Sequence, residues 1–341
     1  MYSKNNFKTA KKKLIQDLKF FLLISFASAL LITNVYAEDF EINHADSLEV
    51  GENSLNIKGN IKIKYKEALI EAPSGNIETD KEGHPTKAIF SGRAKLELAG
   101  KKLEADKITI SINESTIFAE GNTKAELKDK KGIPIYINSD NQQISWNGEN
   151  TKANGNVIAV YNDTKVNSDE GTIIYKLKKP YQAIFYGLSK KACLEQPNNK
   201  TKANQFTLNI NTQDLKANGK VESIIWPDTQ KSRENQEPIK VDTDELYIDN
   251  KSKTITASSN NTLTEPVRVN YQVTNGKSNT AILLRDKQNG KPEKIIFKGK
   301  AQVKQEDKEL SSEEIVFNFE DKKLRSNSSE TSRPKTIIFK K

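Results

Sequence analysis

Residues that build disulfides, metal centres and catalytic triads are scarce in this chain. Its 341 residues include one cysteine and two histidines. Because Cys193 has no cysteine partner, no intrachain disulfide forms, and burial and strand pairing must stabilise the fold. His44 and His84 lie far apart in the sequence and cannot supply an ordinary zinc site. The sequence has no G-x-S-x-G motif and no glycine-rich phosphate loop. We expect no enzymatic activity, no metal and no cofactor.

Long apolar runs are scarce too, and the one present lies near the N-terminus. Met1–Lys19 has six lysines and a single acidic residue, and the 13-residue apolar run Phe20–Ile32 follows it. Val35 and Ala37 place small residues where a signal peptidase reads them, so cleavage before Glu38 is expected. The sequence therefore predicts a signal peptide over residues 1–37.

The alternative is an N-terminal membrane anchor. A bilayer span needs about 20 apolar residues, and the run Phe20–Ile32 is short of that length. Counting the next five residues extends the run to 18 residues, so retention as an anchor stays open. In either case the rest of the chain leaves the cytosol.

The basic charge of the chain comes mostly from this N-terminal segment. The chain has 54 basic and 45 acidic residues. Removing six lysines and one acidic residue leaves 48 basic and 44 acidic residues, a net charge of +4. This small excess without clustered arginines argues against nucleic acid as a partner. A mixed-charge soluble surface is the favoured interpretation, and weak attraction to phosphorylated lipid headgroups is the alternative.

Seven glycines recur in segments that read apolar–x–apolar–x–Gly–x–apolar. The first six follow one another at intervals of 29 to 34 residues, and the seventh comes 80 residues later. A repeat of this length without helical periodicity predicts stacked β-units, which bury their apolar faces only against neighbours. Glycine within a strand marks a bend or a close backbone approach, so seven in register predict a column of small residues. They are Gly59, Gly92, Gly121, Gly155, Gly187, Gly219 and Gly299.

Alternation of apolar and polar residues is the dominant local pattern. Residues Leu55–Ile63 alternate in this way, which is typical of half-buried strands. The alternation in Leu103–Ile110 slips by one residue at Asp106–Lys107, which predicts a bulge or corner there. Beyond residue 37 no segment has sustained 3.6-residue periodicity, so the sequence predicts a nearly all-β fold.

A small residue followed by a polar one recurs 12 to 20 residues after most of these glycines. Asp and Asn side chains accept hydrogen bonds from nearby backbone, so these pairs predict corners between strands. Asp106, Asp140, Asp169 and Asp244 could instead suggest paired carboxylates for glycoside chemistry, but catalytic acids do not recur in every repeat. The segments are Ala72-Pro73-Ser74, Ala105-Asp106, Ser139-Asp140, Ser168-Asp169, Ala203-Asn204, Thr243-Asp244 and Ser311-Ser312.

Two breaks interrupt the regular spacing, Glu195–Thr201 and Pro227–Pro238. The second has no apolar residue and is interpreted as a long loop, or alternatively as a seam between two arrays. We expect one β-repeat array over residues 38–229. Residues 230–341 are expected to continue it or to form a second subdomain.

With this register, the chain resembles the OstA-like family of the lipopolysaccharide transport (Lpt) system, of LptA/LptC type. The resemblance is carried by Ile295–Val303 and Leu310–Phe317, a glycine-centred strand followed by a strand with a small–polar pair. Comparable units recur across most of residues 48–325. Each single motif is degenerate, so the specificity of the resemblance lies in the number of copies.

The resemblance implies an elongated antiparallel β-jellyroll, or V-shaped β-solenoid, with an apolar groove inside. Members of this family bind the acyl chains of lipopolysaccharide there and stack end to end with related jellyrolls in the periplasm. The inward repeat positions are the only site residues that the resemblance transfers. As lipid-binding groove candidates they are Ile61, Ile63, Leu96, Leu98, Val157, Ala159, Phe206, Leu208, Val221 and Val303.

The expected function is therefore a periplasmic bridge that carries lipopolysaccharide between the inner and outer membranes. Its expected partners are the lipid and other Lpt jellyrolls at the terminal strand edges, with an end-to-end homo-oligomer possible. A membrane-anchored LptC-like component is one alternative. A structural or adhesive β-solenoid without a ligand is another.

Overall fold

The computed structural model describes residues 40–146, 148–228, 233–260, 265–327 and 334–338. The expected signal peptide, residues 1–37, lies outside them. The described residues form antiparallel strands and one short 3-10 helix, η1 (Arg233–Asn235), and none of them lies in an α-helix. The prediction of a nearly all-β fold is confirmed. None of the described segments is a helix long and apolar enough to cross a membrane.

The chain divides into two compact units, and each is described by itself. Unit 1 contains the described residues up to Ala99 together with Lys107–Ser115. In this unit β3 pairs with β1, β2 and β4, and β4 pairs with β5. Its strands are β1 (Phe40–His44), β2 (Ser47–Val50), β3 (Ser54–Tyr65), β4 (Ala68–Thr79), β5 (Pro85–Leu98) and the second part of β6 (Lys101–Ser111).

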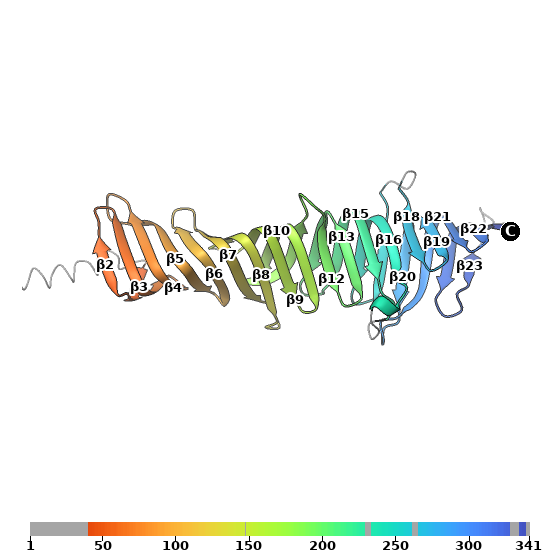
Figure 1. The fold of residues 1–341 in the computed structure, drawn as a ribbon, viewed down its shortest axis with the longest axis horizontal. Coiled ribbons are helices and arrows are strands. Elements are labelled where there is room, and N and C mark those ends of the chain that lie inside the picture. The colour runs from red at the N-terminus through yellow and green to blue at the C-terminus, as the bar shows by residue number, and fades with distance from the viewer. Residues whose placement is uncertain (1–39, 147, 229–232, 261–264, 328–333, 339–341) are drawn as a thin grey trace, which may run out of the picture. The chain divides into compact units, whose positions relative to one another are not determined.

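Unit 2 contains Gly100–Asp106 and the described residues from Thr116 onward. Its strands are coloured from yellow to blue in Figure 1. They are the first part of β6, β7 (Thr116–Lys128), β8 (Pro134–Ser145), β9 (Asn150–Tyr161), β10 (Thr164–Lys176), β11 (Lys179–Tyr186), β12 (Ala192–Gln196), β13 (Asn199–Ala203), β14 (Gln205–Asn209), β15 (Leu215–Ile225), β16 (Ile239–Asp249), β17 (Thr254–Ser258), β18 (Val267–Tyr271), β19 (Thr274–Ser278), β20 (Thr280–Arg285), β21 (Pro292–Gln305), β22 (Lys308–Asn318), β23 (Leu324–Asn327) and β24 (Lys335–Ile338).

Each long strand of unit 2 bends in the middle, so that its two parts belong to two facing arms of the sheet. Strand β10 shows this directly, because residues 170–176 pair with β11 and residues 165–167 pair with β12. Strand β15 rejoins the arms by pairing with β14 in its first part and β13 in its second. Arm 1 therefore holds β11, β14, β17, β20 and β23, and arm 2 holds β12, β13, β18, β19 and β24, with the matching parts of the long strands.

The arms join at a corner that the repeated glycines form. At β9, Gly155 and Asn156 both have positive φ, 75° and 48°, a conformation that glycine and asparagine tolerate best. These two residues lie opposite the single Asp169 of β10, as in a β-bulge. A two-against-one bulge bends and twists the strand locally, which turns the chain from one arm into the other.

The same corner recurs in both units. Each of six glycines has a positive φ, as does the residue after it. In four corners of unit 2 a Ser or Thr hydroxyl donates to the carbonyl two residues ahead: Ser139 to Asn141, Ser168 to Glu170, Thr243 to Glu245 and Ser278 to Thr280. The glycine pairs are Gly59-Asn60 and Gly92-Arg93 in unit 1, and Gly121-Asn122, Gly155-Asn156, Gly219-Lys220 and Gly299-Lys300 in unit 2. The glycines of the predicted column are thus bulged corners within each unit, except Gly187.

Gly187 does not share this conformation, which corrects the prediction of seven equivalent glycines. It lies between β11 and β12, where the bent strand is replaced by two short strands and a loop. There the carboxylate of Asp169 accepts hydrogen bonds from the backbone N–H groups of Leu188 and Ser189, both at 2.7 Å. Between β11 and β12 this loop therefore connects the two arms, as a glycine corner does in the bent strands.

The predicted break Glu195–Thr201 is wrong, because it lies within the hairpin of β12 and β13. The search for alternating apolar residues missed this strand, because its inward residues Asn199 and Thr201 are polar although they are buried. The Oδ1 atom of Asn199 accepts hydrogen bonds from the hydroxyls of Thr201 (2.9 Å) and Ser223 (3.0 Å). This network satisfies the buried hydroxyls and lets a polar strand take an inward position.

Two further corners lie at or near their predicted positions. In β22 the residue opposite Gly299-Lys300 is Glu313, so the corner pair is Ser312-Glu313, one residue after the predicted Ser311-Ser312. The slip predicted at Asp106–Lys107 is confirmed, because Ala105 and Ile108 are both buried while the two residues between them are not.

Candidate functional site

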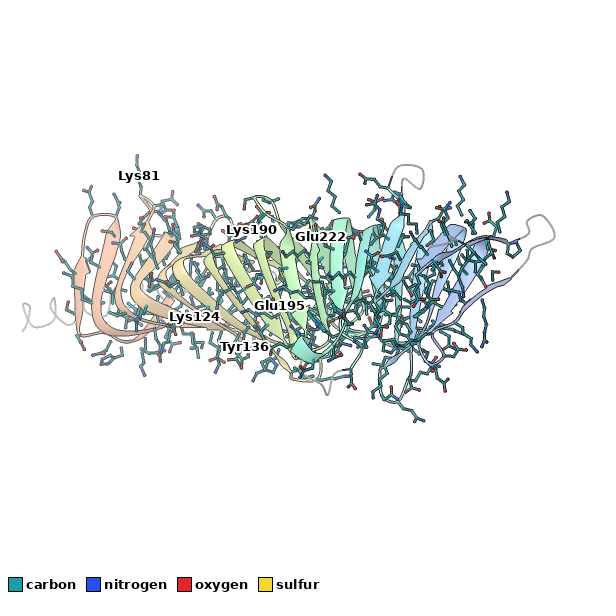
Figure 2. All side chains as sticks on the ribbon, turned by 45° about the vertical axis from the view of Figure 1, so that its right-hand side comes forward. Lys81, Lys124, Tyr136, Lys190, Glu195 and Glu222 are labelled. Carbon is teal, nitrogen blue, oxygen red and sulfur yellow. The ribbon has the colours of Figure 1, made fainter. Side chains whose placement is uncertain are left out.

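The interior between the arms is lined by alternate apolar side chains. All ten predicted groove residues point inward and are 0–6% exposed. Outward residues such as Lys124 and Tyr136 project away from unit 2 (Figure 2). The predicted inward set is Ile61, Ile63, Leu96 and Leu98 in unit 1, and Val157, Ala159, Phe206, Leu208, Val221 and Val303 in unit 2.

The interior of unit 2 is closely packed around these residues. An apolar cavity of about 10 Å³ lies among Ala159, Val166, Phe185 and Leu208. A space of this size is about that of one water molecule, far less than an acyl chain occupies. An acyl chain therefore fits at this cavity only if the residues around it move apart.

Movement of the arms is limited by the contacts at the mouth, which is the side opposite the corner in unit 2. The turns at the outer ends of arm 1 and arm 2 face each other there, and the arms meet at individual contacts of different chemistry. These contacts are Lys101–Tyr175, Tyr161–Ile210, Asp228–Lys291, Tyr271–Phe319 and Gln305–Lys322.

The first mouth contact is a cation–π pair. The Nζ atom of Lys101 lies 3.7 Å from the centre of the Tyr175 ring, whose hydroxyl is 3.0 Å from that of Thr151. Burial lowers the pKa of Lys101 to about 8. Burial also raises the pKa of Tyr175 to about 12, so the tyrosine stays neutral at physiological pH.

The second mouth contact is the hydroxyl of Tyr161. It lies 2.8 Å from Oδ2 of Asp129 and 3.2 Å from the carbonyl oxygen of Ile210, on the opposite arm. Burial and the neighbouring Asp129 carboxylate both raise the pKa of Tyr161. Tyr161 thus stays protonated and links arm 2 to arm 1 at neutral pH.

The segment Pro227–Pro238 forms the third contact, and its described part is a loop held at several points. The carboxylate of Asp228 forms a 3.2 Å ion pair with Lys291 of the β20–β21 turn. The guanidinium of Arg233 donates to the carbonyl oxygens of Gln196 and Pro197 and lies 4.2 Å from the Trp226 ring. Strand pairing continues across the segment, since Ile225 of β15 lies opposite Ile239 of β16.

Between the second and third contacts the mouth opens into a cavity of about 600 Å³, which we call the mouth cavity. Arm 2 contributes the turns at 161–164 and 196–198, and arm 1 contributes Leu208, Leu215, Ile248 and the turn around Arg285. Tyr161, Thr164 and Leu208 line both this cavity and the small apolar cavity. The mouth cavity therefore adjoins the apolar interior of unit 2.

The four recurrent aspartates act in separate corners. Asp106 accepts from Asn122 (2.7 Å) and Asp140 accepts from Asn156 (2.9 Å). Asp244 accepts from the hydroxyl of Ser259 at 3.0 Å, much as Asp169 accepts from its own loop. The prediction that these aspartates are corner residues is confirmed, because each accepts hydrogen bonds at its own corner.

In unit 1, Asp80, Glu82 and His84 place potential metal-ligating atoms close together. They lie on the turn between β4 and β5, where Oδ1 of Asp80 accepts hydrogen bonds from the backbone N–H groups of Glu82 and His84. Those hydrogen bonds lower the pKa of Asp80, the one from His84 most strongly. They account for the cluster as a tight turn on the surface, and we assign it no metal.

Sequence reasoning did not identify the mouth residues Lys101, Tyr161 and Arg285. Arg285 follows the buried residues Ala281 and Leu283 at two-residue spacing, so strand parity could have placed it inward. Strand parity also places Lys101, two residues before Leu103, and Tyr161, two residues after Ala159, inward. Their partners lie in other segments of the chain, which no local pattern indicates.

The fold and the site define an all-β protein whose antiparallel strands bend into two arms around an apolar interior. No family model matches the chain, and no curated protein matches it. Among solved structures, the chain is similar to LptH of Pseudomonas aeruginosa, described as the LptA-homologous periplasmic component of a lipopolysaccharide transport device. The identity is 16% and the TM-score 0.34, and the match covers 42% of this chain and 99% of LptH.

Proposed function

We propose that this protein is a periplasmic lipid-binding bridge that carries lipopolysaccharide between the inner and outer membranes. Its acyl chains would lie between the two arms, against the inward apolar residues. The observation that carries the proposal is that the two arms are joined by a repeated corner on one side of the interior and meet at a mouth on the other side. In unit 2 the mouth cavity adjoins the apolar interior at Leu208.

The energetics support an opening of the mouth. Transfer of one twelve-carbon chain out of water is worth on the order of 9 kcal/mol, at about 0.8 kcal/mol per methylene. A cation–π pair, a neutral hydrogen bond and a surface ion pair each contribute about 0.5–2 kcal/mol. Insertion of a chain can therefore offset the loss of several mouth contacts.

The terminal strands favour partners that add a strand. In unit 1, β2 pairs with β3 alone among the described strands and exposes Leu48 and Val50. In unit 2, β24 pairs with β22 alone among the described strands and exposes Ile337 and Ile338. Exposed apolar edges invite pairing with another sheet. Another Lpt jellyroll or a second copy of this chain would continue the apolar interior there.

A structural β-solenoid without a ligand is the second candidate. The close packing of the interior of unit 2, with an apolar cavity of only about 10 Å³, favours it. It predicts that the arms stay closed and that the mouth contacts serve stability alone.

Lipid extraction separates these functions. The protein is purified without detergent from lipopolysaccharide-producing cells, extracted with organic solvent and analysed by mass spectrometry. We expect acyl-bearing lipid with the wild type and with Thr207→Asn, an outward change on β14. We expect much less with Leu208→Asn, because an amide would then face the acyl chain.

Melting curves check that both variants fold. Absence of lipid from the wild type would support the solenoid instead. The mass of the intact protein also tests the two N-terminal alternatives, since cleavage before Glu38 gives the soluble form and a retained segment gives the membrane-anchored one.

A further inference from the structure

The mouth cavity contains an arginine at a position where the strand pattern calls for an apolar residue. In β20, Ala281 and Leu283 point into the interior and are buried. Arg285 follows at the next inward position and lines the cavity with Leu208, Leu215 and Ile248. The strand therefore places a guanidinium group next to apolar surface at the edge of the interior.

This guanidinium is incompletely satisfied within the described protein. Its Nη2 atom is buried and has no hydrogen-bond partner among the described residues. Burial lowers the pKa of Arg285 to about 10, so the group remains charged at neutral pH. Buried charges are ordinarily paired, because the loss of hydration is costly unless an opposite charge offsets it.

The surroundings are chemically suited to an anion. Lys253 and Lys287 also line the cavity, whereas Asp163 is its single acidic lining residue. The Nζ atom of Lys253 donates to the side-chain oxygen of Asn250 at 3.1 Å, which holds it at the rim. The lining thus combines three cationic groups with an apolar floor.

We propose that the mouth cavity binds the anionic headgroup of an amphiphile, a phosphate or a carboxylate, and that Arg285 recognises it. The planar guanidinium forms two parallel hydrogen bonds with such oxyanions. The apolar floor would contact the first methylenes of the attached chain. The assignment to a lipid headgroup rests on the proposed function, whereas the anion chemistry rests on Arg285 and the cavity alone.

Binding of three probes tests the proposal by calorimetry: n-dodecyl phosphate below its micelle concentration, n-dodecyl maltoside and inorganic phosphate. The variants are Arg285→Met, Arg285→Lys and the control Arg268→Met. Arg268 is an exposed arginine on β18 of the same unit, outside the mouth cavity.

We expect the wild type to bind dodecyl phosphate about tenfold more tightly than dodecyl maltoside, as one charge-assisted bidentate contact would provide. Arg285→Met should remove this preference while leaving maltoside binding unchanged. Arg285→Lys should keep part of it, and Arg268→Met should behave as the wild type. Equal binding of dodecyl phosphate by the wild type and Arg285→Met would overturn the proposal.

The probes also separate the two sources of the anion and the two proposals. Inorganic phosphate binding as tightly as dodecyl phosphate would overturn the assignment to a lipid headgroup. Failure of the wild type to bind dodecyl maltoside would contradict the proposed lipid function, while phosphate binding would still report on Arg285.

Stability gives an independent check. Because Arg285→Met removes a half-buried charge whose Nη2 atom is buried without a hydrogen-bond partner, the unliganded variant should melt at the wild-type temperature or above it. A clear fall in melting temperature would show that the guanidinium is already paired within the protein, against the proposal.

Discussion

The corner and the mouth of unit 2 hold the two arms in different ways. At the corner the same arrangement recurs, with a glycine and the next residue at positive φ opposite one polar residue of the neighbouring strand. At the mouth every contact differs from the next: a cation–π pair, a tyrosine hydroxyl, an ion pair and an aromatic pair. The corner is therefore a repeated connection between the arms, interrupted at Gly187, and the mouth is a set of separate contacts.

The corner and the mouth also differ in how far apart in the sequence the interacting residues are. At the corner the polar residue is bonded within one or two neighbouring strands, as Asp106 is to Asn122. At the mouth the partners come from opposite arms, and Tyr161 and Ile210 are 49 residues apart. Loss of a corner should disturb the stacking of strands, whereas loss of a mouth contact should mainly free one arm from the other.

The largest expected effect is at the corner glycine Gly121. A Cβ atom there would lie 2.6 Å from Oδ2 of Asp106, in a backbone conformation with φ of 75°. We expect Gly121→Ala to lower the free energy of unfolding by about 3 kcal/mol, from backbone strain plus the disturbed hydrogen bond between Asp106 and Asn122. Chemical denaturation measures this loss.

Gly132 is the matched control for Gly121. It also has a positive φ, 82°, but a Cβ atom there would meet nothing within 4 Å. Gly132→Ala should lower the free energy of unfolding by only about 1 kcal/mol, the cost of the left-handed conformation. Equal losses in the two variants would mean that close contact with Asp106 contributes nothing at the corner.

A smaller effect is expected at the mouth residue Tyr161. Tyr161→Phe removes the one O–H donor that Asp129 and Ile210 share, and we expect about 1.5 kcal/mol less stability. Hydrogen exchange should accelerate in the turn after β14 while the corner amides stay protected. Tyr136→Phe is the control, because the Tyr136 side chain is exposed (Figure 2). Faster exchange at the corners as well would contradict independent opening of the mouth.

The smallest effect is the pH dependence of the Lys101–Tyr175 pair. The pKa of Lys101 is lowered to about 8 in the folded protein, so the unfolded chain binds more protons above that pH. The penalty for burying the charged lysine thus disappears as the pH rises from 8 to the ordinary lysine value. We expect a gain of about 1 kcal/mol, since attraction to the Tyr175 ring favours the charged lysine and so makes the pKa shift smaller than burial alone would.

Matched variants isolate this contribution of Lys101. Denaturation at pH 7 and pH 9.5 should show the gain in the wild type and in Lys124→Met, which alters an exposed lysine. The gain should be absent from Lys101→Met. A gain that persists in Lys101→Met would show that another group causes it.

The sequence predicted the corner well because its signals are local. A glycine in an alternating strand and a small–polar pair in the next strand are readable over a few residues, and the ten inward positions follow from strand parity. The exception, Gly187, has the same local pattern but lies where two short strands replace a bent one. Whether a strand continues through the corner depends on neighbouring strands, which the local pattern does not contain.

The mouth could not be predicted in the same way. The ring of Tyr175 and the amine of Lys101 are brought together by strand stacking, and neither residue is unusual in its own segment. The burial of Asn199 and Thr201 was not predicted, because a polar segment is ordinarily interpreted as a surface loop. Their side chains are hydrogen-bonded to each other, and the sequence alone does not show this. Arg285 was detectable in principle by its parity with Ala281 and Leu283, but a charged residue at a strand end is ordinarily taken as solvated.

The most direct test of the whole account is photo-crosslinking from the strand that lines both cavities. A photo-reactive amino acid replaces Leu208, which points inward, or Thr207, its outward neighbour on β14. After irradiation in cells, we predict a lipopolysaccharide adduct at position 208 and none at position 207. Adducts at both positions, or crosslinks from position 208 to the protein's own side chains alone, would contradict an interior that opens to accept a lipid.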